Sequence, residues 1–173
     1  TGRMGSIIEK MLELSELETR RGLRDREQVQ IGRLAGEVLE GLALQIERKG
    51  LVVEQSIDPK SAVAGERFLL RHALANLLEN AIRFSPRGGR IAISAEKKND
   101  LMTISITDQG PGIPDYAIDR VFNRFYSLPD PDTGKKSTGL GLPFVREAAA
   151  LHGGSAEVVN VPGGTRASII LPA

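Results

Sequence analysis

The strongest constraint on the fold is the stretch of residues 66–84, where apolar side chains recur at helical spacing. The apolar positions are Leu70, Leu74, Leu77, Leu78 and Ala81. They fall on one face of an α-helix, with polar residues around the rest of it. A helix of this kind must bury its apolar face against a second layer. The sequence on either side must therefore supply that layer.

The flanking segments predict a sheet and further helices. Alternating or short apolar runs bounded by turn residues predict strands at 51–57, 62–64, 91–95, 101–107, 155–159 and 165–171. Helical periods predict helices at 4–23, 31–49 and 139–152, and the charged stretch 22–30 is typical of a linker. The pattern indicates an α+β fold, a two-layer α/β sandwich with a mixed sheet, helices on one face, and an added N-terminal helix.

Composition excludes several classes of function. A net charge of +1 gives no reason to expect a nucleic-acid partner. The absence of cysteine excludes a disulfide scaffold and a cysteine-ligated zinc site. No apolar run approaches the roughly 20 residues that cross a bilayer, so we expect these residues to form a soluble domain.

Polar residues interrupt the long helix in a regular way. Asn76 and Asn80 are four residues apart and share a face, and Arg83 follows one turn later. An amide oxygen is a hard, neutral ligand that suits Mg²⁺ beside phosphate oxygens. The alternative is that both asparagines are exposed or capping residues.

A second polar cluster begins where the strand at 101–107 ends. Asp108 shares strand parity with the core-facing residues, and a carboxylate buried there needs a donor, such as an adenine amino group. Gly110 and Gly112 would let the backbone approach a flat ring. Thr165 also faces the core and could support the same ring. The alternatives are an ordinary turn at Asp108 and a threonine chosen for strand propensity.

A third cluster precedes the helix at 139–152. Gly139 and Gly141 lie just before it, where backbone amides bind phosphate well. A flexible connection is the alternative. The long stretch between Phe122 and Gly139 is typical of a functional lid. Residues 130–134 are similar to part of a calcium loop, but no glutamate follows at the required spacing.

The order of these clusters resembles the histidine-kinase ATPase domain, which has the Bergerat fold and belongs to the superfamily of DNA gyrase, Hsp90 and MutL. The resemblance covers about residues 29–172. The matching segments are an asparagine box at 76–84, a first glycine box at 108–114, a phenylalanine box at 122–126, a second glycine box at 139–142, and closing signals at 152–154 and 164–165.

The resemblance implies that ATP and Mg²⁺ bind this domain. Asn80 would ligate Mg²⁺, Asn76 would assist near the phosphates, and Arg83 would contact phosphate. Glu79 is a candidate base that activates the acceptor, or else an exposed helix residue. The full set of nucleotide-contacting residues implied by the resemblance is Asn76, Asn80, Arg83, Phe84, Asp108, Gly110, Gly112, Ile113, Phe122, Arg124, Phe125, Thr138, Gly139, Leu140, Gly141, Leu142 and Thr165.

The sequence departs from the family pattern in the lid. Ser127 stands where many members carry arginine, and Ser137 stands where glycine is common. Arg124, Lys135 and Lys136 are candidates for the missing positive charge.

Asn76 matters most for mechanism. Gyrase-like ATPases carry at this position a glutamate that activates water. The resemblance therefore predicts phosphoryl transfer to a protein acceptor rather than hydrolysis.

The resemblance also implies a whole-protein function, a sensor protein-histidine kinase of a two-component system. Residues 1–24 would be the end of the second dimerisation helix and a linker, and residues 25–173 the catalytic domain. The γ-phosphate would pass to a histidine on the first dimerisation helix and then to a response regulator. His72 and His152 are not followed by an acidic residue, as an acceptor histidine would be. The stretch from residue 8 to residue 70 is reminiscent of CreC-type sensor kinases.

We expect the full-length protein to be a homodimer anchored in the inner membrane, with this domain in the cytoplasm. Three alternatives stay open: a nucleotide-sensing module without transfer, a gyrase- or Hsp90-like ATPase, and a serine/threonine kinase of the anti-sigma type.

Overall fold

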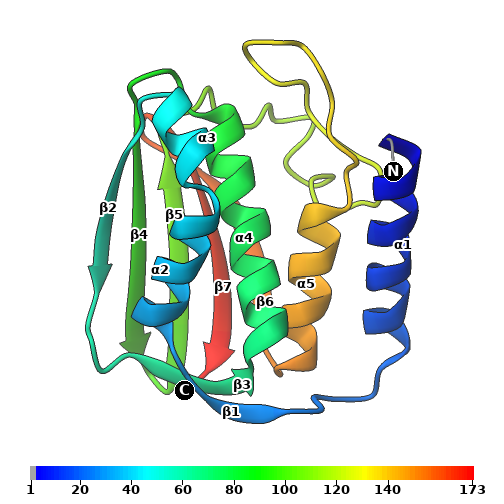
Figure 1. Ribbon diagram of the computed structural model, residues 1–173, viewed down its shortest axis with the longest axis vertical. Coiled ribbons are helices and arrows are strands. Elements are labelled where there is room, and N and C mark those ends of the chain that lie inside the picture. Colours follow the sequence, from blue (N-terminus) through cyan, green and yellow to red (C-terminus); the bar gives the residue numbers. More distant parts are fainter. Residues whose placement is uncertain (1–2) are drawn as a thin grey trace.

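The computed structural model describes residues 3–173, and Figure 1 shows its elements. The helices are α1 (Arg3–Thr19), α2 (Ile31–Gly41), α3 (Ala43–Arg48), α4 (Arg67–Phe84) and α5 (Gly141–Leu151). The strands are β1 (Arg26–Gln30), β2 (Val52–Ile57), β3 (Ala62–Glu66), β4 (Arg90–Lys98), β5 (Leu101–Asp108), β6 (Ser155–Val161) and β7 (Gly164–Pro172). None of the helices in this range is both long and apolar enough to cross a bilayer.

The main sheet has five strands in the order β2-β4-β5-β7-β6. β2 and β4 run parallel, and the other neighbours are antiparallel, so the sheet is mixed. Helices α2, α4 and α5 cover one face of it (Figure 1). The predicted two-layer architecture with helices on one face is therefore confirmed.

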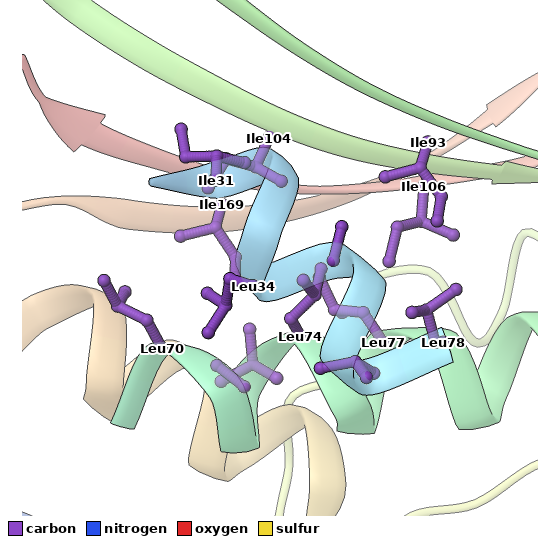
Figure 2. Close-up of a cluster of buried hydrophobic side chains, with 14 of the residues drawn as sticks. Ile31, Leu34, Leu70, Leu74, Leu77, Leu78, Ile93, Ile104, Ile106 and Ile169 are labelled. Atoms are coloured by element: carbon purple, nitrogen blue, oxygen red, sulfur yellow. The ribbon is translucent and has the colours of Figure 1, made fainter. Parts of the chain in front are cut away.

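The core lies between α4 and the sheet. The predicted apolar face of α4 is buried, and Leu74 and Leu78 are at most 1% exposed. Figure 2 shows leucines of α4 facing isoleucines of the sheet, among them Ile93 and Ile106. Each fully buried side chain of this size contributes about 1.5–3 kcal/mol relative to an exposed one. The apolar face that helical periodicity gives α4 and the inward-facing residues of the strands thus pack in a single core.

The segment predicted as a linker contains a strand, so that prediction is wrong for residues 26–30. β1 pairs antiparallel with β3 in a separate two-stranded ribbon, from Arg26 opposite Glu66 to Gln30 opposite Ala62. Only Val29 of β1 is buried. The strand therefore exists because β3 supplies a partner, and its own sequence is too polar to predict it.

Three helix boundaries also differ from the prediction. The helix predicted at 31–49 is divided into α2 and α3 by Leu42, whose backbone leaves the helical region. The helix α1 ends at Thr19 rather than at residue 23. The helix α5 begins at Gly141, because Gly139 has a positive φ of 72° that a right-handed helix does not accommodate.

The N-terminal helix packs beside α5 (Figure 1). Leu14 and Leu17 are buried at 2% and 4% exposure, whereas Ile8, Met11 and Leu12 are exposed. The helix therefore has one apolar side on the domain and leaves other apolar residues uncovered.

Three residues that we call the junction connect the end of α1 to the domain: Arg20, Glu66 and His152. Arg20 donates to Glu66 with a shortest N···O distance of 2.5 Å, and their side chains are 6% and 10% exposed. The Glu66 backbone N–H donates to His152 Nε2 at 3.0 Å. The junction thus joins α1, the start of α4 and the end of α5.

Candidate functional site

A pocket opens at the C-terminal end of α4, between this helix, the edge of the sheet where β5 ends and β7 begins, and the two glycine boxes. From α4 come Asn80, Arg83 and Phe84. Asp108 comes from β5 and Thr165 from β7. The elements meet here because the helical period and the strand pairing place these polar residues at one edge of the core.

Asp108 is the buried acid of the pocket, at 8% exposure. One carboxylate oxygen accepts from the Gly110 N–H at 2.8 Å, and Thr165 is the β-sheet partner of Asp108. Burial raises the pKa of Asp108, although the backbone hydrogen bonds from Gly110 and Thr165 act in the opposite direction. A carboxyl group with spare acceptor capacity therefore faces a mostly apolar cavity.

Gly110 is required by its packing. A methyl group there would lie 2.7 Å from the carbonyl oxygen of Phe84 and 3.0 Å from the Asp108 carboxylate. Both distances are too short for a carbon atom. The glycine lets the loop after β5 turn closely around Asp108.

Arg83 is the cation of the pocket. Its Nε is buried and has no hydrogen-bond partner among the described residues, and its guanidinium lies 4.6 Å from the centroid of the Phe84 ring. Burial lowers the pKa of Arg83, while the carboxylates of Asp130 and Glu79 act to raise it. Arginine stays protonated at neutral pH in proteins. The pocket thus contains a positive charge with unused donor capacity, which suits an anionic ligand.

The second glycine segment also contributes to the pocket. Gly139 and Gly141 line it, and α5 starts at Gly141. The first backbone amides of a helix lack acceptors within the helix, and its dipole favours negative charge there. Gly139 also passes close to the backbone of Phe125 and Tyr126, so a side chain at this position would clash. The segment supplies a second anion-binding element of the pocket.

Asn160 of β6 fixes the loop that carries Gly112. Its amide nitrogen donates to the Ile113 carbonyl at 2.8 Å, and its amide oxygen accepts from the Ile113 N–H at 2.8 Å. This reciprocal pair holds the first glycine box to the edge strand. Nothing in the sequence predicts it, since Asn160 reaches residue 113 only through the sheet.

The lid, which we define as residues 122–139, lines the pocket with residues near its two ends. Ser127 and Leu128 line the pocket from one side of the lid and Ser137 from the other, and the hydroxyls of Ser127 and Ser137 are 2.9 Å apart. The two serines that depart from the family pattern therefore contact each other and close the base of the lid.

The pocket contains ten of the residues predicted to contact nucleotide. They are Asn80, Arg83, Phe84, Asp108, Gly112, Ile113, Gly139, Gly141, Leu142 and Thr165. Seven others do not line it: Asn76, Gly110, Phe122, Arg124, Phe125, Thr138 and Leu140. Gly110 nevertheless contacts the pocket acid, because its N–H donates to the Asp108 carboxylate.

Asn76 and Glu79 lie in a second cleft, between α4, α5 and α1. Lys10 and Glu13 of α1 face them there, together with Leu140. The two asparagines of α4 thus open toward different spaces, Asn80 toward the pocket and Asn76 toward α1. Asn76 still approaches the second glycine segment, since a methyl group on Gly141 would lie 3.2 Å from its amide oxygen.

Two lid residues point away from the pocket. Arg124 forms an ion pair with Glu18 of α1, and Phe125 is 56% exposed with a positive φ of 65°. Arg124, one of the three candidates for the missing positive charge of the lid, is therefore engaged with α1 in this structure.

Sequence reasoning missed the apolar floor of the pocket and one cation. The floor includes Leu77, Ala81, Ile106, Val158 and Ala167. Helical period and strand parity place these residues on the core side, so the signal is present in the sequence but does not distinguish a pocket floor from the core. Lys49 was also missed, and its contacts with the end of α4 depend on the tertiary fold.

Comparisons with known proteins agree with this geometry. Residues 65–173 match the family described as histidine kinase-, DNA gyrase B-, and HSP90-like ATPase. The chain is 42% identical to the sensor protein CreC of Escherichia coli K12 over 98% of its own length, and it spans 35% of the length of CreC.

Two solved structures share the fold. A mycobacterial sensor histidine kinase, MprB, is similar over 86% of this chain and 97% of its own, with a TM-score of 0.73 and 31% identity. Histidine kinase ThkA, solved with the response regulator protein TrrA, is similar over 98% of this chain and 47% of its own, with a TM-score of 0.79 and 24% identity.

Proposed function

The chain belongs to the histidine kinase-, DNA gyrase B- and HSP90-like ATPase family, and on that premise we propose that its pocket binds ATP with Mg²⁺ for transfer of the γ-phosphate to a histidine. The observation that carries the proposal is the polarity of the pocket. A buried acid, Asp108, lies in the apolar part, and an incompletely paired cation, Arg83, lines the same pocket as Gly139 and Gly141.

The residues present fit an adenine nucleotide. The Asp108 carboxylate would accept from the exocyclic amino group, and Gly112 and Thr165 would flank the ring. Arg83 and the first amides of α5 would hold the phosphates. Asn80 would offer its amide oxygen to Mg²⁺, which binds few protein ligands when phosphate supplies the rest. The bound Mg²⁺ would supply charge neutralisation at the phosphates.

The residues beside the pocket favour transfer over hydrolysis. Asn76 lies next to the glycine segment and has no basic site to activate water. Glu79 lies in the cleft that faces α1, where it would accept a proton from an incoming imidazole. The chemistry requires mainly positioning and charge stabilisation.

We also propose that residues 1–24 are the end of a dimerisation helix and a linker, and residues 25–173 the catalytic domain. The exposed apolar residues of α1 support this, because they suit packing in a helical bundle. The longer protein would be a homodimeric sensor kinase at the inner membrane with this domain in the cytoplasm. Its partners would be its own phosphoacceptor helices and a response regulator. The structure of ThkA in complex with the response regulator protein TrrA supports the second partner by analogy.

Nucleotide titration tests the binding half of the proposal. ATP binding to the unmodified chain should tighten with Mg²⁺, and Asn80→Ala should remove that gain. Asp108→Ala should weaken ATP and adenosine alike by about 10–100-fold, the value of a hydrogen bond to a charged group. An unmodified chain that binds neither ligand would refute the proposal.

Transfer is tested by adding the phosphoacceptor helices of CreC as a separate polypeptide. Labelled phosphate from ATP should appear on that polypeptide and should require Asn80. Steady release of phosphate without transfer would instead indicate a gyrase-like ATPase.

A further inference from the structure

Three residues form a row across the sheet at the edge of the pocket. Asp108 of β5 is paired with Thr165 of β7, and Thr165 is paired in turn with Asn160 of β6. Asp108 and Thr165 line the pocket, whereas Asn160 lies one strand further out. Because β6 is an edge strand, no further strand covers this end of the row. The Asn160 side chain reaches instead the loop that follows Asp108, residues 109–113.

The loop 109–113 is held by hydrogen bonds near both of its ends. Close to its start, the Gly110 N–H donates to the Asp108 carboxylate at 2.8 Å. At its end, the Asn160 amide nitrogen donates to the Ile113 carbonyl oxygen at 2.8 Å, and the amide oxygen accepts from the Ile113 N–H at 2.8 Å. Two bonds from one side chain fix both the position and the orientation of the Ile113 backbone. The loop therefore has one local attachment and one attachment that only the sheet provides.

Gly112 allows the Asn160 amide to lie against the loop. Its backbone has a positive φ of 80°, and a methyl group on it would lie 3.2 Å from the Asn160 amide oxygen. Glycine adopts this φ without strain and leaves room for the amide. Gly112 and Ile113 both line the pocket. The part of the loop that Asn160 holds is therefore a wall of the pocket.

We propose that Asn160 is a positioning residue for the nucleobase, which fixes the wall at Gly112 and Ile113 relative to Asp108 before the ligand enters. This rests on the proposed function, since it assigns a role in the same pocket to a residue that does not line it. Ordering a loop during binding costs free energy, and a loop that is already fixed avoids that cost. Because the wall would flank the adenine ring, binding of the base depends on Asn160 and binding of the phosphates does not.

The test titrates the full chain with adenosine and with ATP and Mg²⁺. In Asn160→Ala, the dissociation constants for both ligands should rise by the same factor, about three- to tenfold, the range that one net hydrogen bond gives. The number of binding sites per chain should not change. If Asn160 only stabilised the fold, the variant would instead show fewer sites with unchanged dissociation constants. In transfer to the phosphoacceptor helices of CreC, the KM for ATP should rise by the same factor while kcat stays constant.

The matched control is Ser155→Ala, which removes an exposed polar side chain from the other end of β6 and should leave both dissociation constants unchanged. A second measurement needs no nucleotide: hydrogen exchange of the Ile113 amide, followed by NMR, should be faster in Asn160→Ala and unchanged in the control. Unchanged dissociation constants in Asn160→Ala, or a loss for ATP that adenosine does not share, would overturn the positioning role. If the unmodified chain binds neither ligand, the proposed function itself falls, which is a distinguishable result.

Discussion

The two ends of α4 are held in opposite ways. At its start, Glu66 joins Arg20 and His152 in the junction, where every side chain is nearly buried. At its end, Lys49 links the last carbonyls to the lid, and the lid carboxylate of Asp132 is 50% exposed. Buried charges are costly to separate, whereas exposed pairs contribute little. One helix is thus held by a buried network at one end and by a partly exposed ion pair at the other, and four substitutions test this contrast.

Glu66→Ala should have the largest effect on stability. It leaves the Arg20 guanidinium buried without its carboxylate, and breaking a buried pair on one side costs about 3–5 kcal/mol. Chemical denaturation should show this loss. Replacing both partners, Arg20→Met with Glu66→Leu, should recover most of it, and a double variant as unstable as Glu66→Ala would show that the pair itself stabilises the junction.

His152→Leu should cost less, about 1–3 kcal/mol, because it leaves the Glu66 backbone N–H without an acceptor. It should also change the pH dependence. Burial lowers the pKa of His152 from its usual value near 6.5; the Ala148 carbonyl and Glu66 oppose this, and Arg26 and Arg20 add to it.

The direction of the pH dependence follows from the preference of the folded state for the neutral His152 ring. The stabilisation that the neutral ring gives the folded state is complete above about pH 6.5. It is lost as the pH falls through the lower pKa that His152 has in the folded state. Urea midpoints at pH 7 and pH 5.5 should therefore differ more for the unmodified chain than for His152→Leu. Equal differences would mean that His152 does not titrate in the junction.

Lys49→Met should cost about 1 kcal/mol or less. It removes a cation from the C-terminal end of α4 and one donor from the carbonyls of Ile82 and Arg83, which water can replace. The thermal midpoint should fall slightly, and hydrogen exchange should increase at residues 80–84 but not at 67–70. A loss as large as that of Glu66→Ala would remove the contrast between the two ends.

Asp132→Asn should have the smallest effect, within about 0.5 kcal/mol, because its side chain is 50% exposed and lies 3.7 Å from Lys49 Nζ. Arg24→Ala is the matched control, since its pair with Glu16 is also exposed, with side chains 62% and 56% accessible. Both variants should unfold at nearly the midpoint of the unmodified chain, as measured by denaturation in low salt.

The elements that the sequence predicted correctly depend on local pattern. The period of Leu70, Leu74 and Leu78 fixes the buried face of α4, and strand parity places Asp108 on the core side. Both rules involve residues a few positions apart, so they can be read without knowledge of the partner element. Helix α4 and all five strands of the main sheet follow from such patterns.

The contacts that could not be predicted join residues that are distant in the chain. Asn160 meets Ile113 across the sheet, and Lys49 meets the end of α4 only after α3 and α4 have packed. Arg124 is a candidate for the pocket by sequence, but its charge is engaged by Glu18 of α1. Side-chain direction in a loop depends on whichever partner the fold brings near, and the sequence does not contain that information locally.

The ribbon of β1 and β3 has a mechanical consequence. Its antiparallel ladder of five residue pairs ends at Arg26 opposite Glu66, the end nearest α1. A force that drew α1 away from α4 would act first on this terminal residue pair. The strands would then separate one residue pair at a time rather than all at once. The bond between Arg20 and Glu66 lies at that same end. The two strands therefore cannot begin to separate at this end until the bond between Arg20 and the buried Glu66 carboxylate breaks.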